Sequence, residues 1–371
     1  MSGFGLPILG WSSECDELRI LSASETVEIE MSVIAGLGIE VLHRQAEYVA
    51  VNGVITISGL QEMLNRYCLL HYNMLDDMNE AGLMPKCTFK WRVVGDAWQE
   101  TLVVYNRRKM SFPLIGDNLF FGVQDRQRKV RVGQSVPLYY WVSFGAVSVG
   151  LAYVNKAGVV SYAEKQLPDN SEGMWAKLDA SVGGAVSYVL GGWDDVWRVL
   201  YYDFQLQDSE KIYDRVRCEV EYDNLSAPHI LEVMFLNMFG VYETLLMTGS
   251  DTESVELESS TGYANGKLIR TDGVLQVLHK MHSGWLSRAR YATVIDMCES
   301  PWVAVKAADG GWREIVVTEL KAERVRPNNM PDDVVVSWRY AERIGQLRAV
   351  FEPVNPAADD VFDYSFDRVF D

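Results

Sequence analysis

The sequence predicts an all-β protein with two antiparallel β-sandwich or barrel-like domains, two short helices and a C-terminal extended arm. Apolar and polar residues alternate along most of the chain, as in segment 26–33, which is the pattern of a half-buried antiparallel strand. Asn-Gly pairs at 52–53 and 265–266 supply the two positive-φ residues of a two-residue hairpin. Many short strands separated by turns favour sandwiches or barrels over a parallel α/β sheet.

Further alternating runs define the predicted strands in order. They cover residues 47–57, 88–94, 101–105, 136–142, 147–154, 196–206, 215–222, 274–281, 312–317 and 334–340. The segment 185–190 lies between two Gly-Gly pairs and is predicted as one more strand between turns.

Two short helices are predicted from apolar spacing and end signals. The first begins after Ser58, which forms a capping-box pattern with Gln61, and runs to about His71 or on to Met78. The second begins after Ser287 and ends before Pro301. Both are too short to build a helical domain, so we expect them to cover sheet edges or openings.

The chain of 371 residues exceeds what one hydrophobic core usually supports. A polar break at 207–211 predicts an N-terminal domain of residues 1–210 and a C-terminal domain of residues 211–352. A second break at 352–360, which contains prolines and acidic residues, predicts an extended linker into an arm of residues 353–371.

The predicted arm repeats a Phe-Asp pair every four positions, with Phe362, Phe366 and Phe370 as its aromatic residues. Exposed rings at a chain end would reduce solubility, so we expect them to dock on the body of the chain or on a neighbouring subunit. They form a candidate subunit interface. Deletion of residues 353–371 should then leave a folded protein that fails to assemble, whereas unfolding would place the arm in the core of its own chain.

Charge makes a nucleic-acid partner unfavourable. With 34 basic and 51 acidic residues the net charge is 34 − 51 = −17, which repels polyanions. Basic clusters at 107–109 and 126–131 are predicted to lie at strand edges or to pair with acidic neighbours.

The five cysteines are scattered, so the sequence predicts reduced and mostly buried thiols in a protein folded in a cytoplasm. The first ten residues do not match a secretory signal, because they lack a basic region and Gly and Pro interrupt their apolar run. No apolar run approaches the ~20 residues of a membrane-spanning helix.

No pattern of catalytic, cofactor or metal-ligand residues is found, so the sequence predicts a protein that is not an enzyme. His279 and His282 have metal-like spacing only on a helix, and they lie in a strand pattern. Nucleophile-elbow and phosphate-loop motifs are absent from the sequence. Adjacent acidic pairs such as Asp194 and Asp195 cannot face each other across a glycosidase cleft.

Aromatic residues cluster at Trp193, Trp197, Tyr201 and Tyr202 and again at 139–141. One interpretation is that these rings fill sandwich cores and subunit contacts. The alternative is a carbohydrate-binding or adhesin module for host polysaccharide, which would lose affinity when Trp193 or Trp197 is replaced by Ala.

The segment 232–249 combines two predicted strands with an Asn-x-Phe-Gly turn. Asn237 is expected to hydrogen-bond its own backbone and Gly240 to adopt a positive φ. Phe235, Phe239 and Tyr242 would anchor the hairpin in a core. An ordinary hairpin of any β domain would show the same features.

This hairpin resembles the Phe-Leu-Asn-x-Phe-Gly-Val-x-Glu-Thr segment of tail and baseplate proteins from bacteriophages and prophages of Bacteroides-type bacteria. The N-terminal strand, Asn-Gly turn and short helix, the strand 334–341 and the Phe-Asp repeat agree with those proteins in order. The resemblance implies a virion structural protein of the tail tip, similar to distal-tail proteins that form a ring. It therefore implies a homo-oligomer, other tail proteins as partners, synthesis in the host bacterial cytoplasm and a location in the virion tail. Enzymatic tail functions are not implied, because no lysin or peptidase pattern is present.

Overall fold

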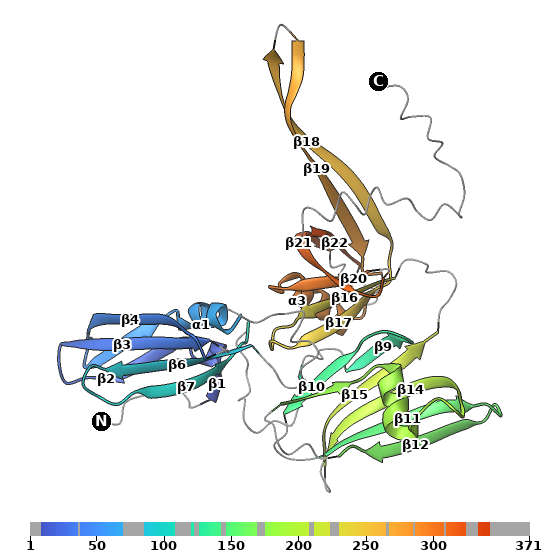
Figure 1. Ribbon diagram of the computed structural model, residues 1–371. Helices are drawn as coiled ribbons and strands as arrows, with labels where there is room; N and C mark the ends of the chain where they lie inside the picture. The colour runs from blue at the N-terminus through green and yellow to red at the C-terminus, as the bar shows by residue number, and fades with distance from the viewer. Residues whose placement is uncertain are drawn as a thin grey trace.

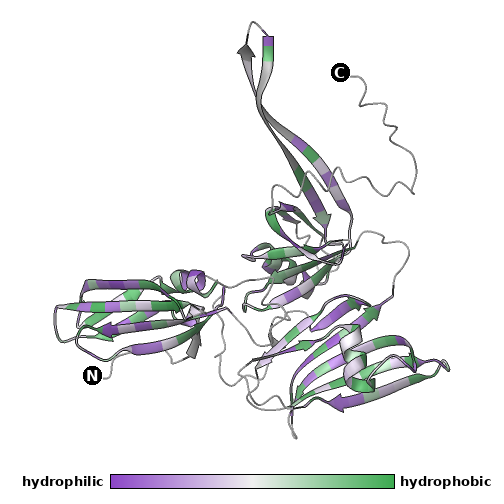
Figure 2. Ribbon diagram, viewed as in Figure 1, coloured by the Kyte–Doolittle hydropathy of each residue, from purple (hydrophilic) through white to green (hydrophobic). Residues whose placement is uncertain are grey.

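The computed structural model describes residues 9–35, 38–69, 85–107, 120–121, 126–141, 146–168, 175–207, 211–222, 230–264, 267–284, 286–307, 309–323 and 333–341. These residues form strands β1–β22, helices α1–α3 and one 3-10 turn, η1 (Figure 1). The all-β prediction is confirmed. Alternating polar and apolar positions are visible along the strands in Figure 2.

The N-terminal module, residues 9–107, contains a five-stranded sheet in the order β1-β7-β6-β3-β4, and β2 pairs separately with β5. Its core includes Ile29, Leu64 and Phe89, which are fully buried. Its elements are β1 (Leu9–Trp11), η1 (Ser12–Glu14), β2 (Glu17–Leu21), β3 (Thr26–Ala35), β4 (Glu40–Val49), β5 (Val54–Ser58), α1 (Leu60–Leu69), β6 (Lys86–Val93) and β7 (Gln99–Val104).

The middle module, residues 120–222, contains a three-stranded sheet, β13-β10-β8, and a five-stranded sheet, β12-β11-β14-β15-β9. Both contribute to a single core that includes Leu138, Val149 and Phe204. Its elements are β8 (Phe120–Phe121), β9 (Gln127–Arg131), β10 (Pro137–Trp141), β11 (Ala146–Asn155), β12 (Val160–Gln166), β13 (Trp175–Asp179), α2 (Val182–Leu190), β14 (Val196–Gln207) and β15 (Ile212–Glu221).

The C-terminal module, residues 230–341, contains a seven-stranded sheet in the order β17-β16-β20-β21-β22-β19-β18. Its core includes Phe235, Val294 and Trp338. Its elements are β16 (Leu231–Leu236), β17 (Tyr242–Met247), β18 (Asp251–Ala264), β19 (Lys267–His282), α3 (Arg288–Cys298), β20 (Val303–Lys306), β21 (Trp312–Glu323) and β22 (Asp333–Tyr340). In Figure 1 the three modules are separate lobes.

The sheets group the chain differently from the predicted boundary at residue 210. That position falls between β14 and β15, which pair in register from Tyr201 opposite Glu219 to Gln207 opposite Ile212. A division there would separate hydrogen-bonded neighbours in one sheet. The polar break instead connects two adjacent strands, and the described residues form three modules. Most pairs are antiparallel, but β1 with β7 and β9 with β15 are parallel.

The helices correct the sequence interpretation at two places. Segment 185–190 belongs to α2 and not to the predicted strand, because Ser181 caps the helix by accepting a hydrogen bond from the Gly184 N–H at 3.0 Å. Helix α1 is present, but Ser58 ends β5, and Asp16 Oδ1 accepts the Gln61 N–H at 3.3 Å. The predicted cap of that helix is therefore wrong.

Two further local predictions are confirmed, the start of α3 and the Asn-Gly turn at 52–53. Helix α3 begins after Ser287, whose hydroxyl accepts the Arg290 N–H at 3.2 Å. Asn52 and Gly53 both have positive φ, at 54° and 75°. The five cysteines are free thiols. Within the described ranges no helix is both long and apolar enough to cross a bilayer.

Candidate functional site: a three-module junction around the β16–β17 hairpin

The turn of the β16–β17 hairpin has the geometry that its sequence predicts. The Asn237 side-chain oxygen accepts the Phe239 N–H at 3.0 Å and the Val241 N–H at 3.3 Å. Gly240 has φ +74°, and its N–H donates to the Asn237 carbonyl at 3.0 Å. Asn237 is buried, so its side chain replaces water as the partner of these backbone groups.

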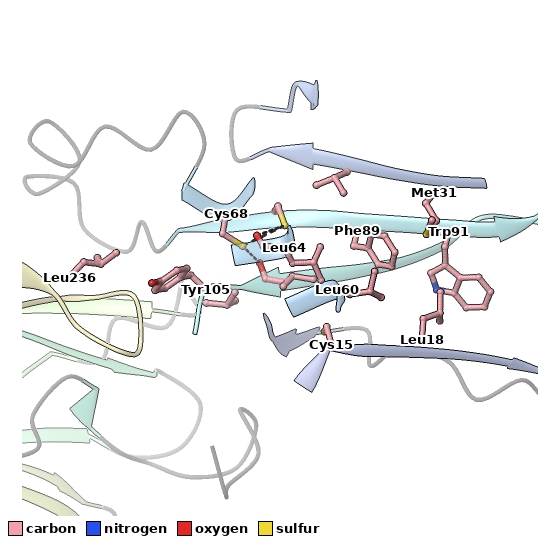
Figure 3. Close-up of a cluster of buried hydrophobic side chains, with 14 of the residues drawn as sticks. Cys15, Leu18, Met31, Leu60, Leu64, Cys68, Phe89, Trp91, Tyr105 and Leu236 are labelled. Carbon is pink, nitrogen blue, oxygen red and sulfur yellow. Dashed lines mark hydrogen bonds between the residues drawn. The ribbon is translucent and has the colours of Figure 1, made fainter. Parts of the chain in front are cut away.

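The hairpin packs against the end of the N-terminal module. A Cβ placed on Gly240 would lie 2.8 Å from the Tyr105 ring, so only glycine fits at this approach. Tyr242 lies edge-on to Trp302, with ring centroids 5.5 Å apart. Tyr105 and Leu236 belong to the same buried cluster as the N-terminal core and are seen at one end of it in Figure 3. The apolar core therefore continues from one module into the other.

Polar contacts fix the same two modules. The Arg107 N–H donates to the Met238 carbonyl at 3.0 Å. Its guanidinium donates to the Asp296 carbonyl at 2.8 Å and also pairs with the Asp296 carboxylate. The other carboxylate oxygen of Asp296 accepts the Met238 N–H at 3.0 Å. Because Asp296 is fully buried, this carboxylate depends on these donors for its stability.

The middle module contacts the other side of the hairpin through Arg128, which is buried. Arg128 Nη2 donates to the Thr244 carbonyl at 2.6 Å and lies 3.4 Å from Glu243 Oε1. Asn237 donates to the other Glu243 oxygen at 3.4 Å. Burial raises the pKa of the Glu243 carboxyl to about 7, although Arg128 and the hydrogen bond from Asn237 act in the opposite direction.

A second set of polar contacts connects the turn before β10 to β16 and β17. The Thr244 hydroxyl donates to the Ser135 carbonyl at 2.6 Å, and the Ser135 N–H donates to Glu232 at 2.9 Å. Lys306 binds Glu232 at 2.9 Å and the Gly133 carbonyl at 3.2 Å. The β16–β17 hairpin thus contacts both other modules.

The described residues of the two basic clusters include several with acidic partners, as one of the sequence interpretations predicted. Arg107 pairs with Asp296 and Arg128 lies beside Glu243 at the junction. Two further pairs lie within the middle module, Arg126 with Asp214 and Lys129 with Glu221.

The two edges of the seven-stranded sheet have different surroundings. Edge strand β17 is covered, since Arg128 and Arg290 of α3 donate to the carbonyls of Thr244 and Leu246. The opposite edge strand, β18, pairs with β19 alone among the described strands. Strand β19 in turn pairs with β22 only from His279 to His282.

The rest of the β18–β19 hairpin forms a two-stranded ribbon. We call this ribbon the arm; it is a different segment from the predicted C-terminal arm of residues 353–371. It runs from the Val255–Val277 pair to the Ala264–Lys267 pair, ten positions along β18. At ~3.3 Å per residue this is about 33 Å. Figure 1 shows the arm extending from the rest of the C-terminal module. Val255 and Leu268 are 50% and 60% exposed.

A cleft of about 920 Å³ lies between the middle and C-terminal modules, beside the junction. We call it the inter-module cleft. Residues that line it include Tyr139, Lys177, Asp179, Trp193, Tyr242 and Trp312.

The structure brings together only part of the set predicted from the sequence. Asn237, Phe239, Gly240 and Tyr242 lie at the junction, whereas Phe362, Phe366 and Phe370 lie outside the described residues. Glu243 and Asp296 were not predicted from the sequence. A charged residue within the apolar strand 242–247 was the available signal for Glu243, because a buried carboxylate requires a partner. No group of three potential metal ligands occurs in the described part of the chain.

Comparisons with known proteins give weak likenesses. No protein-family model and no curated protein matches the chain. A chain from the virion of a native gene transfer agent particle is 15% identical with a TM-score of 0.21, and the match covers 33% of this chain and 95% of that chain. A chain from the tail of an empty gene transfer agent particle with C6 symmetry is 16% identical, with a TM-score of 0.21 and coverage of 33% and 96%.

A third solved structure, the Dpr2 Ig1-Ig2 complex with DIP-Theta Ig1-Ig3, is 7% identical with a TM-score of 0.15, and the match covers 89% of this chain and 85% of that chain. TM-scores of this size define neither a shared fold nor a shared function.

Proposed function

We propose that this protein is a non-catalytic structural subunit of a phage-tail-like virion, at the tail tip or baseplate. In this role it forms a homo-oligomeric ring, similar to distal-tail proteins, and contacts other tail proteins. The resemblance of the hairpin sequence at 232–249 to tail and baseplate proteins supports the class.

The arm is the observation that carries this proposal. An isolated two-stranded ribbon is marginally stable in water, and an uncovered edge strand is a template for pairing with another chain. Pairing with a second copy would cover the β18 edge and the exposed side chains of Val255 and Leu268. A head-to-tail contact, in which this edge pairs with a different surface of the next copy, can close into a ring.

The junction supports the same role. Buried polar contacts and a continuous core fix the hairpin against both other modules, through Arg107 on one side and Arg128 on the other. A subunit whose modules hold fixed angles presents its outer edges in a reproducible arrangement, which a repeated assembly requires.

The test shortens the arm without changing its base. Replacement of residues 256–276 by Asn-Gly joins Val255 to Val277, which are already paired, through a two-residue turn. Light scattering should give a multiple of the chain mass for the wild type and the single-chain mass for the shortened variant. A wild-type protein that stays monomeric at all concentrations, and is missing from purified particles by mass spectrometry, contradicts the proposal.

A further inference from the structure

The inter-module cleft has the size and position of a ligand site. Ligand pockets are typically about 300–1,000 Å³ and occur preferentially at domain interfaces. The cleft, at about 920 Å³, lies between the middle and C-terminal modules, next to the contacts that fix them. Its shape therefore depends on the same junction that holds the hairpin.

Aromatic side chains from both modules line this cleft. Trp193 comes from the middle module and is 41% exposed, and Trp312 comes from the C-terminal module and is partly buried. Tyr139 and Tyr242 line it with buried rings. An exposed indole beside a cleft offers an apolar face to a ligand, and the tyrosines combine apolar rings with hydroxyl groups.

The polar side chains of the cleft are mixed in charge. Lys177 and Asp179 are two residues apart on β13, so they lie on the same face of that strand, while Leu178 between them points into the core. One ammonium and one carboxylate give a donor and an acceptor with no net charge. Burial lowers the pKa of the Lys177 ammonium, and the charge of the Asp179 carboxylate acts in the opposite direction.

These features select among ligand classes. A phosphate ligand would require several cations, and the net charge of −17 opposes polyanions. A lipid tail would be held by apolar walls without charged side chains such as these two. Sugar rings have apolar C–H faces that pack on aromatic rings and hydroxyl groups that both donate and accept hydrogen bonds. We propose that the inter-module cleft binds a neutral saccharide, with Trp193 and Trp312 packing on sugar rings and Lys177 and Asp179 binding hydroxyl groups.

The test is a titration of the full-length protein, followed by intrinsic tryptophan fluorescence and calorimetry. The probes are neutral tetrasaccharides of glucose, mannose, galactose and N-acetylglucosamine, with decanoate and inorganic phosphate as the other classes. Trp193→Ala should weaken saccharide binding by about tenfold or more, as expected for loss of a buried aromatic contact. Trp197→Ala is the matched control, because Trp197 is 68% exposed in the same module and does not line the cleft.

Trp193→Phe keeps an apolar ring and should retain part of the affinity, which separates stacking from a general loss of structure. The proposal is supported if a tetrasaccharide binds, if Trp193→Ala weakens that binding and if Trp197→Ala leaves it unchanged. It is overturned if no tetrasaccharide binds, if decanoate or phosphate binds in their place, or if both Ala variants bind as the wild type does. The proposed assembly depends on the arm, so a negative result here leaves that role unaffected.

Discussion

The two hairpins at opposite edges of the seven-stranded sheet show how the same element can serve different purposes. In the β16–β17 hairpin every residue of β17 is buried, and the edge carbonyls accept hydrogen bonds from Arg128 and Arg290. In the β18–β19 hairpin the first six residues of β18 are exposed. Both edges belong to one sheet. The covered edge joins the modules of one chain, whereas β18 pairs only with β19 among the described strands, and we propose that it pairs with another chain.

The largest expected fall in the free energy of unfolding comes from breaking the contacts that hold the β16–β17 hairpin against the N-terminal module. Asp296→Ala removes the buried carboxylate that binds both Arg107 and the Met238 N–H. The Arg107 charge then lacks its partner, so the free energy of unfolding should fall by about 3 to 5 kcal/mol. Urea unfolding measures this change.

Asp309→Ala is the control for that experiment. It removes a carboxylate whose partner, Arg313, is 48% exposed, and it should leave the free energy of unfolding close to that of the wild type. An equal effect of the two substitutions would show that Asp296 does not hold the junction together.

A smaller fall in the free energy of unfolding is expected from Gly240→Ala. The new methyl group would be strained at φ +74° and would lie 2.8 Å from the Tyr105 ring, so we expect a cost of about 2 to 4 kcal/mol. Gly158→Ala is matched in backbone, with φ +81°, but has open space around it. Its cost should be only the backbone strain, about 1 to 2 kcal/mol. Thermal unfolding compares the two, and equal losses would contradict close packing against Tyr105.

The turn of the β16–β17 hairpin and the positions of most strands follow from local sequence. The places of the two hairpins at opposite edges of one sheet do not. The Asn237 and Gly240 turn could be predicted, because the side-chain bond of Asn and the positive φ of Gly are local properties. Alternation located most strands. It could not show that β18 and β17 are the two edges of one sheet, because strand order depends on partners far apart in the sequence.

The failures have specific causes. Helix α2 was missed because its two glycines suggested turns, although Ser181 and Gly191 form its caps. The predicted boundary at residue 210 used polarity, which marks a hairpin connection as readily as a linker. Partners such as Asp296 for Arg107 are separated by 189 positions, and no local pattern connects them.

The buried Glu243 carboxyl on β17 predicts that the stability of the covered hairpin depends on pH. Its pKa is raised from the ordinary value of 4.5 to about 7 in the folded protein, so the folded state keeps this proton longer than the unfolded state does. The resulting contribution to stability is fully present below pH 4.5 and is lost as the pH rises to about 7, on the order of 3 kcal/mol in total. Glu243→Gln cannot release a proton, so it should lack this decline.

The measurement is the free energy of urea unfolding of the wild type and of the Glu243→Gln variant at several pH values between 4.5 and about 7. The Gln variant should gain stability relative to the wild type as the pH rises. Parallel pH profiles for the two proteins would show that Glu243 has an ordinary pKa and is not shielded from water at the junction.

The smallest effect on the free energy of unfolding is expected from a substitution in the β18–β19 hairpin. Leu268 is 60% exposed on the arm, so Leu268→Ala should change the free energy of unfolding by less than about 0.5 kcal/mol. Its effect should appear in assembly, because the same side chain would be buried against a second copy. Val160→Ala is the control, since Val160 is 65% exposed on β12, away from the arm. Sedimentation velocity should show weaker self-association for the Leu268 variant only. If both variants self-associate as strongly as the wild type, the exposed side chain of Leu268 on the arm makes no contact with a second copy.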